Sequence, residues 1–300
     1  MTFADGIFVS APAKVNLCLH VAERRADGYH DLESLVAFVV HGDEITLEHA
    51  RELSFSAVGP FGAMLPPDND NLALKAARLL ADKVGRPPAV RITLRKNLPV
   101  ASGLGGGSAD AAAVLRGLPS LWKLEIDRET LIGIAALLGA DVPVCLDCAA
   151  AWIEGRGERI TSLSPLPKVP LLLVNPAVPV STAEVFSALG ARSGLKFVCP
   201  RAPFGDLQAL VAFLRSTTNG LEAPARKIAP AICDALEELR DMPEILIARM
   251  SGSGATCFGI FETNESARSA AALLMERHQE WWIVNTTIVP ERIGVPRALQ

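Results

Sequence analysis

The sequence is poor in aromatic residues and has little excess charge. Phe, Trp and Tyr make up 5% of its 300 residues, and Tyr29 is the only tyrosine. Lysine and arginine together number 29 against 33 aspartates and glutamates, so the net charge is −4. That balance offers no general attraction to nucleic acid or to an anionic membrane. We therefore expect neither as a partner, and nothing in the sequence indicates an obligate protein partner.

Export and membrane signals are also absent. No basic segment followed by an apolar core opens the chain, so we expect no signal peptide. The apolar region 131–152 is interrupted by Asp141, Pro143 and Asp147, which argues against a membrane span. Six cysteines lie scattered in apolar surroundings, a pattern typical of buried thiols in a reducing compartment. These features predict a cytoplasmic protein.

A zinc site is not expected either. Cys145 and Cys148 have a spacing found in zinc sites, but no second Cys or His pair accompanies them. Both cysteines lie in a strand-like run, in which we expect a strand at 142–146, and we assign no metal ligand.

The sequence does contain a glycine-rich segment, residues 99–108, between an apolar stretch and an alanine-rich helix expected from about Ser108. Glycines let the backbone approach a ligand closely, and a helix N-terminus offers unpaired N–H groups to an anion. The segment lacks the Gly-Lys-Ser/Thr ending of the P-loop, and Ser108 replaces the third glycine of the dinucleotide fingerprint. It predicts a phosphate site of another nucleotide-binding family, although an ordinary tight turn has similar glycines.

Alternation and turn signals predict a mixed α/β N-terminal part. The first strand alternates apolar residues with a polar face that carries Lys14 and Asn16, so we expect it to be half-buried. In this N-terminal part, strands are expected at 7–21, 44–48, 90–94 and 142–146, and helices at 71–83, 108–115 and 128–138.

The proline-rich stretch 162–170 is the expected junction between two domains, 1–161 and 171–290. The order of elements after it suits an α/β plait on an antiparallel sheet. Strands are expected at 171–174, 245–250, 257–261 and 282–288, and helices at 182–189, 207–214, 230–239 and 265–276.

Three segments, 11–17, 103–108 and 250–256, resemble in order and separation the three motifs of the GHMP kinases. These small-molecule kinases are named for galactose, homoserine, mevalonate and phosphomevalonate substrates. The resemblance covers nearly the whole chain. It implies an α+β, two-domain GHMP kinase fold, in which 1–161 is the N-terminal domain with the ATP-binding glycine loop and 171–290 is the C-terminal domain. ATP as co-substrate and Mg2+ are implied as well.

Two further segments, 24–32 and 139–143, are similar to the signature of one branch of this family. That branch transfers the γ-phosphate of ATP to the 2-hydroxyl of a cytidine-diphosphate-linked polyol in the non-mevalonate isoprenoid route. The resemblance implies catalytic residues Lys14 and Asp141; substrate-binding residues Asn16, Tyr29, His30, Thr182 and Phe186; ATP-binding residues Asn71, Lys96, Pro99, Val100, Ala101, Ser102, Gly103, Leu104, Gly105, Gly106, Gly107, Ser108 and Asp110; and third-motif residues Gly252, Ser253 and Gly254.

The implied roles follow the needs of phosphoryl transfer. Asp141 would accept the proton of the alcohol or orient it, and Lys14 would stabilise the developing negative charge. Tyr29 and Phe186 would sandwich the cytosine, and His30 would hydrogen-bond its edge.

Plainer interpretations remain open. A strand lysine is usually solvated, an aspartate after a helix usually caps a turn, and a turn tyrosine usually packs on a core. The alternatives for function are another GHMP kinase, of homoserine or mevalonate type, and a non-catalytic sensor with the same fold. A serine hydrolase is disfavoured because no Gly-x-Ser-x-Gly elbow occurs.

Overall fold

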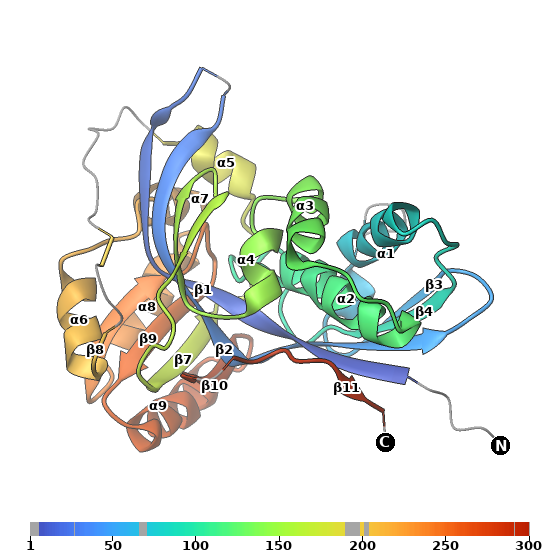
Figure 1. The fold of residues 1–300 in the computed structure, drawn as a ribbon. Coiled ribbons are helices and arrows are strands. Elements are labelled where there is room, and N and C mark those ends of the chain that lie inside the picture. The colour runs from blue at the N-terminus through green and yellow to red at the C-terminus, as the bar shows by residue number, and fades with distance from the viewer. Residues whose placement is uncertain are drawn as a thin grey trace.

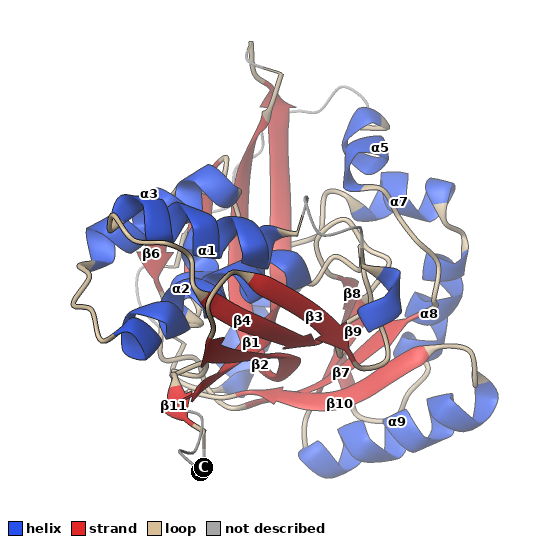
Figure 2. Cartoon of the chain, turned by 90° about the vertical axis from the view of Figure 1, so that its right-hand side faces the viewer, coloured by secondary structure: helices blue, strands red, loops and turns tan. Residues whose placement is uncertain are grey.

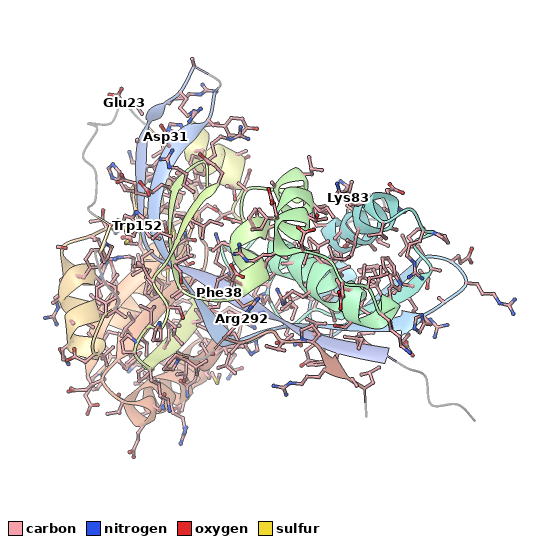
Figure 3. All side chains as sticks on the ribbon, in the orientation of Figure 1. Glu23, Asp31, Phe38, Lys83, Trp152 and Arg292 are labelled. Atoms are coloured by element: carbon pink, nitrogen blue, oxygen red, sulfur yellow. The ribbon has the colours of Figure 1, made fainter. Side chains whose placement is uncertain are left out.

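Two long strands run through the whole molecule. The computed structural model describes residues 6–26, 28–65, 71–189, 199–200, 204–290 and 292–299. In it, β1 (Gly6–Arg24) and β2 (His30–His49) form an antiparallel hairpin whose far end projects from the body (Figure 1). Glu23 and Asp31 lie near that end (Figure 3). At the opposite end, β11 (Arg297–Ala298) pairs with the start of β1, which brings Gly6 and Leu299 side by side.

The second edge of β2 is shared by three strands in turn. Residues 32–36 pair with β5 (Ala151–Gly155), Val39 pairs with the end of β10 (Trp282–Ile288), and residues 44–49 pair with β4 (Val90–Arg95). Two short strands extend these pairings, β3 (Ser54–Val58) parallel to β4 and β6 (Arg159–Ser162) antiparallel to β5. The hairpin therefore joins the N-terminal sheet to the C-terminal one.

Helices cover one face of the N-terminal sheet (Figure 2). They are α1 (Leu72–Lys83), α2 (Gly106–Trp122), α3 (Arg128–Leu138) and α4 (Val142–Asp147), and a 3-10 turn lies at Gly62–Met64. Asn71 and Asp127 cap α1 and α3 by accepting hydrogen bonds from Ala73 N and Thr130 N. The alanine-rich face of α2 packs into the first core with Val9, Ile45 and Leu47.

The C-terminal part confirms the antiparallel plait. Its sheet has the order β10–β7–β9–β8, with every pair antiparallel. The other strands are β7 (Val169–Asn175), β8 (Ile245–Met250) and β9 (Cys257–Phe261), and the helices are α5 (Thr182–Ser187), α6 (Leu207–Arg215), α7 (Glu222–Ile228), α8 (Ala231–Arg240) and α9 (Asn264–Arg277). Buried residues of α7, α8 and α9 form a core with this sheet.

A middle core lies between the two halves. Trp152 (labelled in Figure 3) is buried there with Leu163 and Phe258, and its ring meets Phe213 edge-on at 6.3 Å. The boundaries 1–161, 162–170 and 171–290 stay a prediction. Among the described residues, no helix has the length and apolarity needed to cross a membrane.

The strand expected at 142–146 is wrong, because this segment is the helix α4. Pro143 stands in the first helical turn, where a missing N–H costs nothing and the fixed φ favours a helix start. A short apolar run does not by itself distinguish a strand from a buried helix. Both ends of α2 also differ from the predicted range 108–115. The helix begins at Gly106 rather than near Ser108 and runs past Pro119 to Trp122.

The first strand is not half-buried. Residues 11–19 of β1 are buried on both faces, and the supposedly solvated Lys14 and Asn16 are each only 4% exposed. The polar face is covered because the glycine loop and the turn after β8 pack against it. Burial of these two polar side chains is the first indication of a site.

Candidate functional site

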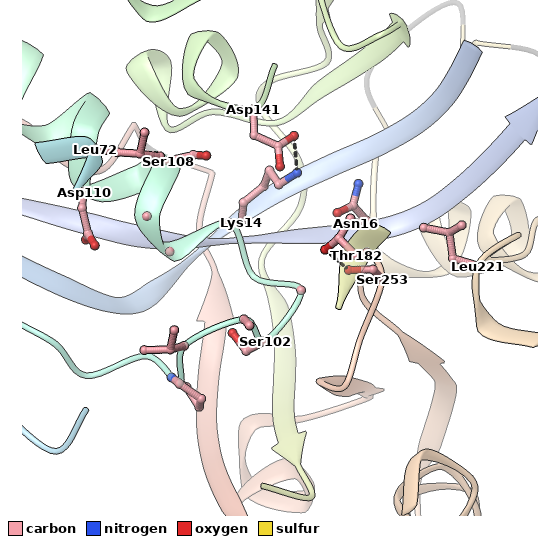
Figure 4. Close-up of a pocket in the computed structure, with 18 of the residues that line it drawn as sticks. Lys14, Asn16, Leu72, Ser102, Ser108, Asp110, Asp141, Thr182, Leu221 and Ser253 are labelled. Atoms are coloured by element: carbon pink, nitrogen blue, oxygen red, sulfur yellow. Dashed lines mark hydrogen bonds and ion pairs between the residues drawn. The ribbon is translucent and has the colours of Figure 1, made fainter. Parts of the chain in front are cut away.

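A pocket of about 430 Å³ opens where β1, the start of α2, α4, α5 and the turn after β8 meet (Figure 4). Most of the predicted site residues line it: Lys14, Asn16, Asn71, Lys96, Pro99, Val100, Ala101, Ser102, Gly103, Gly105, Gly106, Gly107, Ser108, Asp110, Asp141, Thr182, Phe186, Gly252 and Ser253. Leu104, Gly254, Tyr29 and His30 are not in its lining. Segments far apart in the sequence thus converge on one cavity.

The pocket contains an ion pair between Lys14 and Asp141. Lys14 Nζ lies 2.7 Å from Asp141 Oδ1, and the dashed line in Figure 4 marks the contact. The lysine side chain is 5% exposed, whereas that of Asp141, which stands just before α4, is 41% exposed. A Cβ at Gly105 would lie 3.1 Å from Lys14 Cε, so any larger residue at this position would crowd the lysine side chain. The pair presents an ammonium and an accessible carboxylate side by side.

The glycine loop holds the start of α2 beside this pair. Gly103 and Gly105 have φ values of 77° and 64°, which favour glycine. Leu104, itself fully buried, accepts a hydrogen bond from Lys14 N through its carbonyl at 2.9 Å and so ties the loop to β1. The first N–H groups of α2, from Gly106 on, have no acceptor within the helix and lie along the pocket. This arrangement suits a phosphate.

The third motif clamps the loop from the other side. Ser251 Oγ donates to Gly103 O at 3.1 Å and accepts from Asn16 N at the same distance, and Thr256 N donates to Ser102 O. Ser251 was not among the predicted site residues, although it stands in the motif. Gly254 has a packing role, because a Cβ there would lie 2.7 Å from the sulfur of Met250.

A buried cluster of three charges lies behind the loop. Lys96 Nζ is 2.5 Å from Asp43 Oδ2 and 2.8 Å from Asp110 Oδ2, and all three side chains are almost fully buried. Asp43 Oδ1 also accepts from the backbone N–H groups of Asn97 and Leu98. Asp43 thus fixes the segment that leads into the glycine loop.

Burial raises the pKa of Asp110 to about 7, with Lys96 opposing the shift and Asp43 adding to it. Burial lowers the pKa of Lys96, but the two carboxylates outweigh it and the net shift is upward. Sequence reasoning missed Asp43, whose only signal is an acid after Gly42 inside an apolar strand. Lys96 was expected near adenine; its ammonium is held by carboxylates, and its role toward adenine stays a prediction, as does that of Asn71, which caps α1.

Of the residues predicted to bind the cytidine end, Phe186 lines the pocket, whereas Tyr29 and His30 do not. The rings of His30 and Phe186 lie 5.7 Å apart at 38°, and His30 Nδ1 lies 2.9 Å from Ala22 O. Tyr29 is 55% exposed near the end of the hairpin, with the Arg156 guanidinium 4.0 Å from the centre of its ring. The predicted sandwich by Tyr29 and Phe186 therefore stays a prediction.

Two hydroxyls link α5 to the third motif. Thr182 Oγ1 and Ser253 Oγ lie 2.8 Å apart at the rim of the pocket (Figure 4).

Burial raises the pKa of the Cys145 and Cys148 thiols, which keeps both neutral. Within the described ranges, no group of three or more His, Cys, Asp or Glu side chains is placed to hold a metal ion.

Family models and relatives agree on what this chain resembles. Residues 71–151 match the GHMP kinases N terminal domain, and residues 201–276 match the GHMP kinases C terminal model. The 4-diphosphocytidyl-2-C-methyl-D-erythritol kinase of Rhodospirillum rubrum is 46% identical over 99% of this chain and 97% of its own length. The kinase of the same name from Parvibaculum lavamentivorans is 47% identical over 91% of this chain and 95% of its own.

A solved structure supports the same grouping. The crystal structure of a 4-(cytidine 5'-diphospho)-2C-methyl-D-erythritol kinase superposes with a TM-score of 0.74 at 36% identity, covering 93% of this chain and 98% of the other. A Cytophaga hutchinsonii homoserine kinase, with a TM-score of 0.68 at 18% identity over 100% of this chain and 98% of its own, shares the fold alone. The homoserine-type alternative is therefore not favoured. The chain belongs to the GHMP kinase family, in its branch of 4-diphosphocytidyl-2-C-methyl-D-erythritol kinases.

Proposed function

We propose that this protein transfers the γ-phosphate of ATP to the 2-hydroxyl of 4-diphosphocytidyl-2-C-methyl-D-erythritol. Membership of the GHMP kinases implies ATP as the co-substrate. The observation that carries the proposal is the ion pair of Lys14 and Asp141, 2.7 Å apart, beside a glycine loop and the N-terminus of α2. A kinase needs an anion site, a cation and a proton acceptor together, and residues suited to each of these roles line this pocket.

The chemistry then follows from the positions of these groups. The hydroxyl oxygen forms a bond to the γ-phosphorus, the bond from that phosphorus to the bridging oxygen breaks, and ADP leaves. The hydroxyl proton passes to Asp141, whose side chain is accessible from the pocket. Lys14 Nζ stabilises the negative charge that develops on the transferred group, and because it is nearly fully buried its effect is little screened.

The two substrates would occupy opposite sides of this pair. The phosphates of ATP would lie on the glycine loop, in contact with the N–H groups that begin at Gly106. The cytidine end would lie toward Phe186 and His30, with Tyr29 stacking on the base from the end of the hairpin. Asn16, on the same strand as Lys14, would reach the polyol or the diphosphate.

Magnesium would arrive with the nucleotide. Mg2+ in kinases is bound by one or two protein ligands together with phosphates and water, so the absence of a three-ligand cluster among the described residues is compatible with it. The metal would neutralise charge on the phosphates.

A cytoplasmic location is supported by the free thiol state of all six cysteines.

Mass spectrometry of the acceptor tests the proposal. The protein is incubated with ATP, Mg2+ and 4-diphosphocytidyl-2-C-methyl-D-erythritol, with homoserine and mevalonate as parallel acceptors. Only the cytidine-linked polyol should gain one phosphate. Phosphorylation of homoserine or mevalonate at a comparable rate contradicts the proposed substrate, and no transfer to any acceptor contradicts kinase activity.

A further inference from the structure

The Asp43–Lys96–Asp110 cluster lies behind the place where ATP phosphates would bind. A Cβ on Gly106, the first residue of α2, would stand 2.9 Å from Lys96 Nζ and 3.5 Å from Asp43 Oδ2. Lys96 and Asp110 also contribute to the pocket lining. The cluster is therefore close enough to influence an anion at this helix terminus through the protein interior, where charges are poorly screened.

The charge of this cluster does not balance. Two carboxylates share one ammonium, so the cluster carries one net negative charge when both are ionised. A negative charge there repels a triphosphate, whereas a single proton makes the cluster neutral. The proposed phosphoryl transfer does not use this charge, since its proton acceptor is Asp141 at the other side of the loop.

Hydrogen bonding identifies Asp110 as the carboxyl that takes the proton. Both oxygens of Asp43 accept hydrogen bonds, from Lys96 Nζ and from the N–H groups of Asn97 and Leu98. Asp110 Oδ2 accepts from Lys96, but its Oδ1 is buried without a partner. Protonation of Asp110 at Oδ1 therefore breaks no hydrogen bond, whereas protonation of Asp43 would disturb several.

The surroundings of Asp110 leave this assignment intact. Its own pKa is raised to about 7, first by burial, then with Lys96 lowering it and Asp43 raising it. Of the described residues that line the pocket, the other two charged ones, Lys14 and Asp141, pair with each other, and Asn71 and Leu72 at the start of α1 are uncharged.

We propose that Asp110 takes up a proton when the triphosphate of ATP binds on the glycine loop. This inference rests on the proposed function, since it takes ATP as the ligand of the pocket. Nucleotide and proton then bind together, because each lowers the cost of the other. ATP affinity should fall as pH rises, by about sevenfold between about pH 6 and about pH 8.5 if ATP raises the pKa of Asp110 by about 1.

Calorimetry with the non-hydrolysable analogue AMP-PNP and Mg2+ measures this uptake directly. The binding heat near neutral pH is compared in buffers of different ionisation enthalpy, and its slope gives the number of protons bound. The phosphates of AMP-PNP also titrate, but they contribute equally to the wild type and to Asp110→Asn. The wild type should take up more protons than the variant, and the dissociation constant of the variant should change less with pH.

A second variant guards against poor folding of Asp110→Asn. Asp43→Asn removes the neighbouring negative charge, so Asp110 stays ionised beside Lys96 and the extra proton uptake should again be lost. Asp82→Asn, on the exposed face of α1, is the matched control and should behave as the wild type. Equal proton uptake in the wild type and both cluster variants overturns this inference. Failure of the wild type to bind AMP-PNP at all instead overturns the proposed function.

Discussion

Lys14 Nζ and Asp141 Oδ1 lie 2.7 Å apart, although β1 carries one and the start of α4 carries the other. The lysine is buried and the carboxylate is accessible, so the pair has one enclosed member and one that is open to the pocket. The left-handed glycine at 105 keeps the loop close to the lysine stem. Loss of either partner should therefore affect the reaction more than the fold.

The variant Asp141→Asn tests the proposed role of Asp141 as proton acceptor. Asparagine keeps the shape and still accepts a hydrogen bond from Lys14, but it cannot take the hydroxyl proton. We expect turnover to fall by about 10²- to 10⁴-fold, the scale for a positioned acid–base group, while calorimetric binding of AMP-PNP and of the polyol substrate persists. Asp147→Asn, at the far end of α4, serves as the control. Wild-type turnover in Asp141→Asn would remove this residue from the reaction.

The variant Gly103→Ala tests the clamp on the glycine loop. Gly103 has a φ of 77°, and a Cβ there would lie 2.5 Å from the carbonyl oxygen of Ser251. The new methyl group must push the loop away from the third motif, so both the Tm and the affinity for AMP-PNP should fall, with a destabilisation of roughly 1–3 kcal/mol for strain and displacement together.

The matched control for this change is Gly107→Ala. Its Cβ meets only Leu72 Cδ1, at an ordinary 3.8 Å, so the fold should tolerate it. Differential scanning calorimetry of both variants decides the matter. Equal Tm losses at 103 and 107 would show that the contact with Ser251 has no special weight.

Local patterns predicted most of the fold. Helices with clear caps, such as α1 after Asn71 and α3 after Asp127, and strands bounded by turns, such as β8 and β9, lie where expected. The wrong predictions concern β1 and α4, whose burial or secondary structure depends on packing against distant parts of the chain. The polar face of β1 reads as solvated because nothing nearby in sequence shows that distant loops cover it, and the segment of α4 reads as a strand because a buried helix has no amphipathic period.

The site was predictable as far as motifs identify it. The segments carrying Lys14, Asp141 and the glycine loop converge on one pocket, and their roles remain predictions to be tested. Asp43 was not predictable, because its partners Lys96 and Asp110 come from two other elements and a buried charge in a strand has no local pattern. Long-range charge pairing of this kind becomes visible only with the structure.

The variant Phe186→Ala tests whether the Phe186 side of the pocket binds cytidine, as proposed. Phe186 lines the cavity with its ring 5.7 Å from that of His30. Loss of a stacking ring should cost on the order of 1–3 kcal/mol of affinity for CDP, with AMP-PNP binding almost unchanged. Phe204→Ala, whose ring packs on Phe213 in the middle core, is a control for loss of an aromatic elsewhere. Equal weakening of CDP and AMP-PNP binding would indicate a general structural defect instead.

The stability of the unliganded protein should depend on pH through Asp110. Its pKa is raised from 3.8 to about 7, so the folded protein keeps this proton up to near neutrality whereas the unfolded chain releases it near pH 4. The unfolded state therefore binds fewer protons between these values, and the free energy of unfolding falls as pH rises through that window. Asparagine does not titrate, so the variant Asp110→Asn avoids the cost of a buried ionised carboxylate and should be more stable than the wild type at pH 8. The expected gain is on the order of 1 kcal/mol or more, because a tenfold difference in proton affinity between the folded and unfolded states corresponds to about 1.4 kcal/mol. The advantage should shrink toward pH 4. Urea denaturation of the wild type, Asp110→Asn and the exposed control Asp82→Asn at both pH values measures it, and an identical pH dependence in all three would show that Asp110 is ionised in the folded protein throughout.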